Sequence, residues 1–410
     1  DRMCGGVVWE GCDHAIAHGT AENGKTRYYY GGDHGETIHD GNFCMDGLVY
    51  PDRTPHTGLL EYKNVYRPVR IVSYDQENGQ IVLHNYMDFD DLKDYVDIFY
   101  EMTQDGLTVE KGKLANVVAS PHSDAEVELK LQVPNTGKIY LKLIYRLKKE
   151  MPLLEQGYEL GFDEMKLANE DDRNRQAVKW MEQEKAIGTI KQLVLQAKDF
   201  TYVLDKRTGL FEDMQFAGRS YINHPMELNI WRAPTDNDMY IKLEWKKAHY
   251  DAAYTRAYRI EVLQNKHGVL IMEHLAVVAD TVQKILDVEM TWKINENGKI
   301  EAVIEAVKDK EFPDLPRFGI RMFLNKKMDE ITYFGMGPQE SYRDKHQASC
   351  HGLFRSKVAQ MHEDYIRPQE NGSHYDCDYV ELTNGQCGIA AVSKNPFSFN
   401  ASVYTQEELE

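Results

Sequence analysis

The chain has 410 residues, which is enough for two or three domains with cores of their own. It carries 48 Lys and Arg against 66 Asp and Glu, a formal net charge of -18. An acidic protein repels nucleic acid and anionic membranes, so we expect neither as a partner. The sequence has no signal-peptide pattern at its start and no apolar run long enough to span a bilayer, and we predict a cytoplasmic protein.

Residues 1–66 are predicted to be rich in loops. This segment is dense in Gly, His, Asp and Pro, and its apolar runs are short, as at 6–9. A parallel barrel needs eight strand–helix units, and at most about two fit in this length. We therefore expect the segment to dock on the rest of the chain or to stay partly exposed. Loops of this kind carry binding and chemistry on a rigid scaffold.

From Pro68 onward the pattern predicts antiparallel strands. Apolar and polar residues alternate at 127–133 and again at 141–147, with a Pro-Asn-Thr-Gly turn between them, and Asn78-Gly79 marks a hairpin. Period-two alternation indicates a sheet with one face in water. Roughly a hundred residues of this pattern fit an immunoglobulin-like β-sandwich.

A larger, mostly antiparallel sandwich is predicted beyond a polar connection at 169–185. Alternation at 286–294 is followed by an Asn-Gly turn and a return strand at 300–306. The apolar side of the return strand is expected to carry Ile300, Ala302, Ile304 and Ala306. One helix is expected at 244–257, with Trp245, Ala248, Ala252 and Ala253 on one face.

The cysteines and histidines do not predict a disulfide scaffold or a zinc site. None of the cysteines forms a CxxC pair, and the chain is too large to depend on disulfides. No HExxH motif and no tight His/Cys cluster is present. We expect reduced thiols at Cys4, Cys12, Cys44, Cys350, Cys377 and Cys387.

Three residues of the first segment are candidates for a binding site. Trp9 follows a short apolar run, and its indole can stack on the apolar face of a sugar, although a Trp at a strand end is more often part of a core. Phe43 and Asp46 lie three apart in a Gly-flanked loop. A backbone carbonyl and a carboxylate at this spacing can bind a hard cation. The alternative is a turn in which Asp46 caps local amides.

Several motifs together resemble one family. They lie at residues 5–10, 31–36, 42–49, 52–56, 231–238, 333–344 and 367–372, and they read GGVVWE, GGDHGE, NFCMDGLV, DRTPH, WRAPTDND, YFGMGPQESYRD and RPQENG. The chain resembles the long, multi-domain bacterial β-galactosidases of glycoside hydrolase family 2, and the motifs occur in that family's order.

The resemblance implies a mainly β chain in three parts. Residues 1–66 would be the C-terminal remnant of a catalytic (β/α)8 barrel, and residues 67–186 an immunoglobulin-like sandwich with its connecting segment. Residues 187–410 would form a large C-terminal sandwich related in shape to galactose mutarotase. The implied activity is that of a retaining β-galactosidase, which hydrolyses terminal β-D-galactosyl residues of lactose-type substrates.

The resemblance also implies roles for the candidate residues. Trp9 would form a platform for the galactose ring. The carbonyl of Phe43 and the carboxylate of Asp46 would hold Na+ or K+ beside the sugar, and the loop at 232–238 would lie near the mouth of the active site. His39 stands where the family often has Asn. Mg2+ is expected in the intact enzyme, with its ligands outside this chain.

No catalytic residue is expected in these 410 residues. Retaining glycosidases use two carboxylates about 5 Å apart. In the family both lie before the position of Trp9, and the family counterparts of Glu10, Asp13 and Glu36 are not catalytic. We therefore expect the chain alone to be inactive. Its expected partners are a galactoside substrate and either a complementing N-terminal portion or, as the intact enzyme, further copies in a homo-oligomer. The rival hypothesis is a non-catalytic carbohydrate-binding or interaction module of two β-sandwiches.

Overall fold

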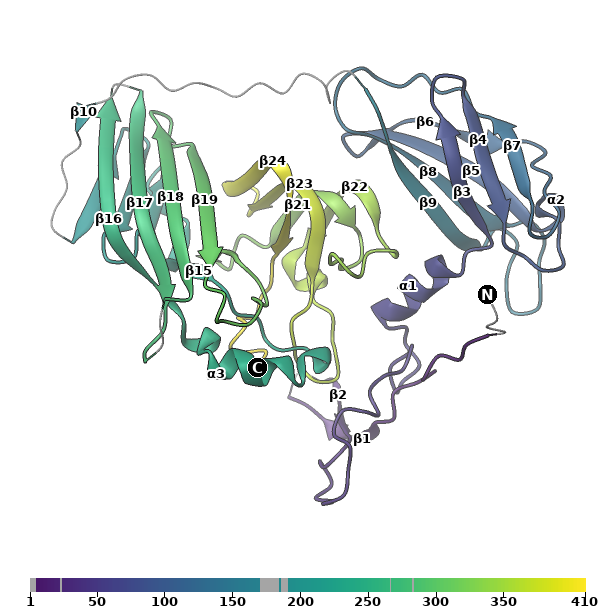
Figure 1. The fold of residues 1–410 in the computed structure, drawn as a ribbon, viewed down its shortest axis with the longest axis horizontal. Helices are drawn as coiled ribbons and strands as arrows, with labels where there is room; N and C mark the ends of the chain where they lie inside the picture. The colour runs from purple at the N-terminus through teal and green to yellow at the C-terminus, as the bar shows by residue number, and fades with distance from the viewer. Residues whose placement is uncertain (1–4, 23, 170–183, 186–190, 266, 282–283) are drawn as a thin grey trace.

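The computed structural model describes residues 5–22, 24–169, 184–185, 191–265, 267–281 and 284–410. The described chain is mostly β, in agreement with the predicted fold class. Figure 1 shows two separate sandwiches with a further sheet between them, and the N-terminal segment below. Within these ranges, no helix has both the length and the apolar character needed to cross a membrane. The predicted connection at 169–185 lies almost entirely outside the described residues.

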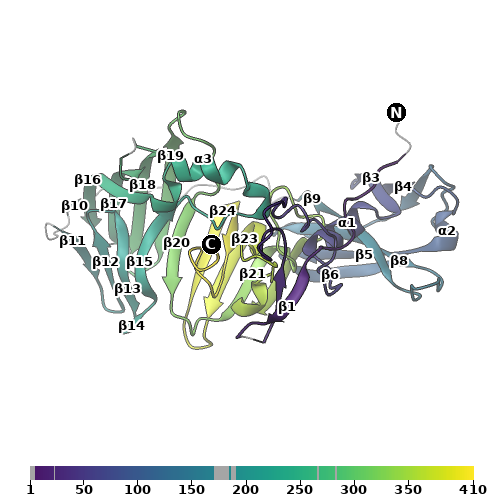
Figure 2. The same cartoon turned by 90° about the horizontal axis from the view of Figure 1, so that it is seen from below.

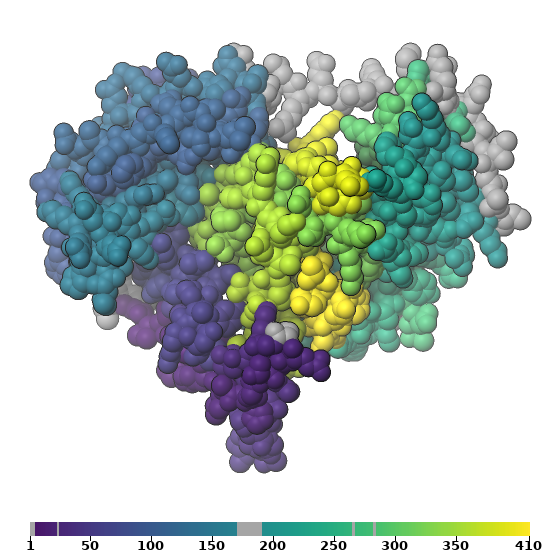
Figure 3. Space-filling view, turned by 180° about the vertical axis from the view of Figure 1, so that it is seen from behind, coloured from purple at the N-terminus to yellow at the C-terminus, as the bar shows by residue number. Residues whose placement is uncertain are grey.

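The N-terminal segment contains little regular structure, as predicted. It has one antiparallel hairpin, formed by β1 (Ile16–Thr20) and β2 (Thr26–Tyr29), and one helix, α1 (Thr57–Val65). The residues between β2 and α1 form successive turns. Figure 3 shows that the first part of this segment projects from one end of the molecule.

The second part is a sandwich of a three-stranded and a four-stranded antiparallel sheet, in the orders β3-β4-β7 and β6-β5-β8-β9. Its elements are β3 (Val69–Asp75), β4 (Gln80–Asn85), α2 (Leu92–Tyr95), β5 (Val96–Gln104), β6 (Leu107–Leu114), β7 (Asp124–Glu128), β8 (Ile139–Leu147) and β9 (Glu159–Leu167). The hairpin at Asn78-Gly79 joins β3 to β4, and Gly79 has the positive φ that such a turn requires. The alternation on β8 is confirmed, because Leu141, Leu143 and Tyr145 are fully buried.

The prediction of a strand at 127–133 is wrong for residues 129–133. Strand β7 ends at Glu128, whose partner Gln80 is the first residue of β4. Beyond that pair the neighbouring chain turns away at Gly79, so no strand remains for Leu131 and Val133 to pair with. These two residues instead pack against the core of the sandwich as an irregular extended run.

The described residues of the C-terminal part form four sheets. A four-stranded sheet, in the order β11-β12-β13-β14, faces a five-stranded one, in the order β10-β16-β17-β18-β19, and β15 pairs with β20. The fourth sheet has the order β22-β21-β23-β24. The elements of the first two sheets are β10 (Glu184–Lys185), β11 (Gln192–Gln196), β12 (Phe200–Asp205), β13 (Leu210–Phe216), β14 (Arg219–Ser220), β16 (Tyr254–Asn265), β17 (Gly268–Val278), β18 (Leu286–Asn295) and β19 (Ile300–Lys308).

The remaining elements of this part are strands and short helices. The strands are β15 (Ile222–Asn229), β20 (Gly319–Leu324), β21 (Glu330–Gly337), β22 (Cys350–Lys357), β23 (Ser373–Thr383) and β24 (Gly388–Asn400). The helices are η2 (Asp236–Asp238), α3 (Ile241–Lys247), η3 (Tyr250–Ala252) and η4 (Val358–Met361).

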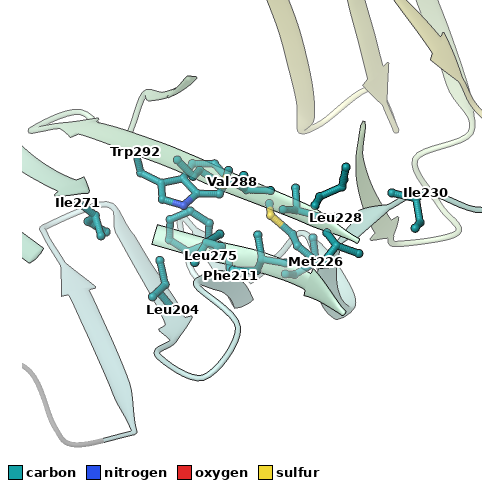
Figure 4. Close-up of a cluster of buried hydrophobic side chains, with 14 of the residues drawn as sticks. Leu204, Phe211, Met226, Leu228, Ile230, Ile271, Leu275, Val288 and Trp292 are labelled. Carbon is teal, nitrogen blue, oxygen red and sulfur yellow. The ribbon is translucent and has the colours of Figure 1, made fainter. Parts of the chain in front are cut away.

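Two apolar clusters hold these sheets, where the sequence predicted one. The larger cluster lies between the first two sheets and includes Phe211, Val288 and Trp292 (Figure 4). The smaller one, around Tyr333 and Cys377, belongs to the fourth sheet. Burial therefore divides the C-terminal part into two packing units.

The alternation at 286–294 is confirmed, because its apolar residues are buried along β18. The return strand differs from the prediction. Ala302 and Ala306 are exposed on β19, while Ile300 and Ile304 are half-buried against the core. Strand β19 is the edge of its sheet, so the facing sheet covers only part of it.

The helix expected at 244–257 is shorter and begins earlier. Helix α3 ends at Lys247, because His249 adopts a left-handed conformation with φ 58° and ends the helical run. Trp245 and Ala248 are buried as expected, and the Trp245 indole N–H donates to the carbonyl of Asp314 (2.9 Å). Ala252 instead lies in η3, and strand β16 begins at Tyr254.

Helix α1 docks the N-terminal segment on both other parts of the chain. The Asn64 side chain donates to the carbonyl of Gln347 (2.8 Å) and accepts from the N–H of Phe162 (2.7 Å). The Glu61 carboxylate accepts from the N–H groups of Gln347 (2.7 Å) and Ala348 (2.5 Å). Figures 1 and 2 show the helix beside β9. The expectation that this segment docks on the rest of the chain is met at α1.

A buried ion pair lies at the start of the same helix. Lys345 Nζ donates to Glu340 Oε1 (2.7 Å) and to the hydroxyls of Thr57 (2.5 Å) and Tyr365 (3.1 Å). Although burial opposes ionisation, Lys345 foremost, and then Tyr365 and the N–H of Gly372, hold the pKa of the Glu340 carboxyl below its usual range. Each charge thus depends on the other for compensation.

Breaking this pair should destabilise the protein strongly. In the Lys345→Met variant, Glu340 keeps its burial and loses its counter-charge, and we expect a loss of about 3 kcal/mol in the free energy of unfolding. The control is Lys357→Met, whose partners Asp329 and Glu330 are half-exposed, and it should lose less than about 1 kcal/mol. Urea denaturation at pH 7 measures both. Equal losses would contradict the argument.

A second prediction concerns the large core, where Glu273 is buried beside Trp292. Its Oε2 accepts from the indole N–H (3.1 Å), Oε1 has no partner among the described residues, and burial raises the pKa of Glu273 to about 8. In the unfolded chain this carboxyl ionises near pH 4.3. Between these two values the unfolded state releases a proton that the folded state keeps. The contribution to stability is therefore complete below the unfolded pKa and is lost as the pH rises to about 8.

Glu273→Gln removes this titration. Relative to the wild type, we expect the variant to gain about 1.4 kcal/mol of unfolding free energy for each pH unit between roughly pH 5 and pH 8. The control is Glu289→Gln, an exposed residue on β18. Urea denaturation at several pH values checks this, and a constant difference across the range would count against a buried, protonated Glu273.

Candidate functional site

The backbone brings the end of the first apolar run against the loop that holds Asp46. The N–H of Glu10 donates to the carbonyl of Asp46 (3.0 Å), and the N–H of Leu48 donates to the carbonyl of Glu10 (3.0 Å). Further along, Cys12 and Val49 form a parallel bridge. Trp9 and Asp46 are therefore neighbours in space although 37 positions separate them in the sequence.

The three predicted site residues all reach solvent. Trp9 is 78% exposed and Phe43 is 64% exposed, and Asp46 is also exposed. In this chain the Trp9 indole is therefore not part of a core, and its faces are available to a ligand. The peptide bond between Trp9 and Glu10 is cis.

Asp46 differs from three other acidic residues of the segment in its hydrogen bonds. Asp33, Glu36 and Asp52 each accept from nearby backbone N–H groups, and such bonds lower the pKa of the Glu36 carboxyl. No hydrogen bond to the Asp46 carboxylate is present within the described ranges. The turn-capping alternative therefore describes these neighbours, while the Asp46 carboxylate remains open to a ligand.

The loop around Phe43 is built from successive turns. The N–H of Phe43 donates to the carbonyl of Asp40 (3.3 Å), and the N–H of Met45 donates to that of Asn42 (2.9 Å). His39 is used within the same loop, where its Nδ1 accepts from the N–H of Gly41 (3.1 Å). His39 thus shapes the backbone next to Phe43.

The loop at 232–238 lies against this segment. Asn42 Nδ2 donates to the carbonyl of Asp236 (3.3 Å). Gln369 holds Asp236 in turn, accepting from its N–H (3.1 Å) and donating to its carboxylate (3.1 Å). Within the loop, Arg232 and the buried Asp238 form a two-pronged ion pair (3.1 and 2.7 Å). Residues from distant parts of the sequence thus support one side of the candidate site.

Sequence analysis missed several residues that complete this arrangement. Asp13 and His56 pair beneath the Asp46 loop, and Tyr50 reaches Glu363 across the chain. Burial, with Asp236 nearby, raises the pKa of Tyr30, whose hydroxyl also bonds Arg367. His56 and Arg367 lie within the motifs at 52–56 and 367–372, but no pattern in the sequence pairs them with Asp13 or Tyr30.

In the part of the chain that is described, no three His, Cys, Asp or Glu side chains converge as metal ligands. Asp46 offers an unbonded carboxylate, and oxygen donors suit hard cations. The five described cysteines, Cys12, Cys44, Cys350, Cys377 and Cys387, are free thiols, and Cys4 lies outside the described residues.

Comparison with known families places each part of the chain. Residues 1–71 match the family described as "Glycosyl hydrolases family 2, TIM barrel domain", and residues 81–168 match "Beta-galactosidase, domain 4". Residues 196–410 match "Beta galactosidase small chain". The three matches follow the predicted order of barrel remnant, first sandwich and large C-terminal part.

Curated relatives match along the whole chain. The β-galactosidase of Actinobacillus pleuropneumoniae is 43% identical over 100% of this chain and 39% of its own length. That of Staphylococcus xylosus is 34% identical, over 100% of this chain and 41% of the relative. The β-galactosidase of Priestia megaterium is 28% identical over 99% of this chain and 39% of its own length. The chain therefore spans about 40% of the length of these relatives, and it belongs to the β-galactosidases of glycoside hydrolase family 2.

Proposed function

We propose that this chain forms the C-terminal portion of a retaining β-galactosidase that hydrolyses terminal β-D-galactosyl residues, as in lactose, and that Trp9, Phe43 and Asp46 form part of its sugar site. The observation that carries the proposal is the exposed Trp9 indole, next to a backbone hydrogen bond that joins Glu10 to Asp46, in a segment that matches the catalytic barrel.

The chain's own residues would bind and orient the sugar. Trp9 offers an apolar face to the galactose ring, where stacking excludes water from one side of the substrate. The Phe43 carbonyl and the Asp46 carboxylate are the groups that would hold Na+ or K+, which supplies a positive charge beside the sugar hydroxyls. Asn42 and Gln369 keep the supporting loops in place. The acid/base and nucleophilic carboxylates, and the ligands of Mg2+, belong to the part of the enzyme outside these residues.

Exposed apolar side chains support a partner that carries the rest of the barrel. Val7 and Ile38 are each 94% exposed, and Ile16 is 63% exposed. A closed barrel buries residues of this kind in layers. We propose that the remaining barrel, as part of the same chain or as a separate polypeptide, covers this face. The intact enzyme is proposed to be cytoplasmic and homo-oligomeric.

The chain alone should not hydrolyse a nitrophenyl β-galactoside. Addition of the N-terminal portion of the enzyme should produce activity, because general acid–base and positioning effects supply most of the rate. Turnover by the isolated chain would contradict the proposal. Binding of galactose to the isolated chain that is unchanged by Trp9→Ala would favour the rival carbohydrate-binding module, because the sandwiches would then carry the site.

In the complemented enzyme, Trp9→Ala should raise KM for the galactoside about tenfold, since a stacked aromatic face contributes roughly 1.4 kcal/mol, and Trp9→Phe should recover part of the loss. Asp46→Ala should weaken activation by sodium at constant ionic strength. The control is Asp52→Ala, because Asp52 is an exposed residue of the same segment that caps Thr54. Asp46→Ala and Asp52→Ala variants with the same sodium response would rule out the cation assignment.

A further inference from the structure

Asp13 is a buried carboxylate directly beneath the candidate site. Its side chain is 0% exposed, and both of its oxygens have partners. Oδ1 accepts from the N–H of Gly47 (2.8 Å), and Oδ2 lies 2.7 Å from Nε2 of His56. A buried carboxylate with a partner on each oxygen has one orientation available, because any rotation leaves a polar atom unpaired.

The group that Asp13 holds is the backbone next to Asp46. Gly47 lies so close to the backbone of Cys12 and Asp13 that a Cβ there would be 2.2 Å from the Asp13 nitrogen. Backbone hydrogen bonds flank this contact, from Glu10 to the carbonyl of Asp46 (3.0 Å) and from Asp13 to the carbonyl of Val49 (3.0 Å). The Asp13 carboxylate therefore fixes the loop at the residue where the chain leaves Asp46.

His56 orients Asp13 and is itself firmly anchored. Its backbone N–H donates to the carbonyl of Leu48 (3.1 Å), and its ring stacks on Tyr50 with 3.7 Å between centroids. The Tyr50 hydroxyl donates to Glu363 (2.6 Å), and the N–H of Glu363 donates to Asn371 Oδ1 (3.0 Å). The orientation of Asp13 is thus tied to the C-terminal part of the chain.

We propose that Asp13, oriented by His56, is a positioning residue that sets the distance between the Trp9 stacking face and the Asp46 carboxylate. This inference rests on the proposed function, because it assigns a role toward the same sugar and cation site. Asp13 touches neither ligand. It acts through the Gly47 N–H, so its loss leaves the sugar and cation groups present with their spacing no longer fixed.

The first test needs no ligand. In the 410-residue chain, Asp13→Ala should raise amide exchange in a peptide covering Cys44 to Leu48 at least tenfold, while exchange on β8 stays at the wild-type rate. Asp13→Asn should restore protection, because its amide oxygen accepts from Gly47 and its NH2 donates to an unprotonated His56 nitrogen. Unchanged exchange in Asp13→Ala, or failure of Asp13→Asn to restore it, would overturn the proposal.

The second test measures the sodium concentration for half-maximal activation in the complemented enzyme. Asp13→Ala should raise it about tenfold and Asp13→Asn less than twofold. The matched control is Asp205→Ala, because Asp205 is a buried carboxylate that bonds Arg207 at the end of β12, in the C-terminal sandwich. If this control raises the sodium concentration for half-maximal activation equally, Asp13 has only a structural role and the proposal is wrong. A wild-type enzyme without any sodium response would instead overturn the proposed cation site, and the exchange experiment would still decide whether Asp13 holds the loop.

Discussion

The arrangement of the candidate site depends on how helix α1 is docked. The helix has nine residues, and its buried residues, Thr57 and Asn64, are both polar. Hydrogen bonds therefore hold this helix against the rest of the protein, whereas most surface helices are held by the burial of an apolar stripe. The Asn64 amide joins the two parts, because it accepts from Phe162 of the first sandwich and donates to Gln347 of the C-terminal part. Gly161 makes this possible, because a Cβ there would lie 2.8 Å from the Asn64 oxygen.

Docking of α1 also determines the position of the site residues upstream. His56 immediately precedes the helix, so the position of Thr57 in the Glu340–Lys345 pocket limits where the imidazole can lie. From His56 the contacts continue to Asp13, then to Gly47, and so to the pair formed by Trp9 and Asp46. The contacts from His56 to Asp13 and from Asp13 to Gly47 are polar, each with one donor and one acceptor. Such contacts define direction and distance more narrowly than apolar packing does.

Much of the fold could be predicted from local patterns. The alternation on β8 and β18 and the Asn-Gly turns follow from interactions between near neighbours in the sequence. The errors occur where a distant partner decides the outcome. Strand β7 stops because β4 begins opposite Glu128, and Ala302 is exposed because no sheet covers that part of β19. Neither fact has a local signature.

The residues of the candidate site also fall into those that the sequence predicts and those that only the structure reveals. Trp9, Phe43 and Asp46 were found because recognisable motifs contain them. The residues that support them were not found, since Asp13 and His56 are 43 positions apart and Tyr50 and Glu363 are 313 apart. A pair of polar residues at such separations has no periodicity, so composition and spacing cannot reveal it. Motifs identify candidate ligand-binding groups, whereas the structure is needed to identify the residues that hold them.

Polar docking of α1 holds an otherwise weakly packed segment against the sandwiches. Amide hydrogen exchange along the wild-type chain tests it most directly, because an isolated helix of this length is unstable in water. We expect amides of α1 to exchange as slowly as those of β8. Amides of β1 and β2 should exchange rapidly, because the residues of these strands are exposed or half-buried. Exchange in α1 as fast as in β1 would contradict it, since the helix would then be no anchor for the site.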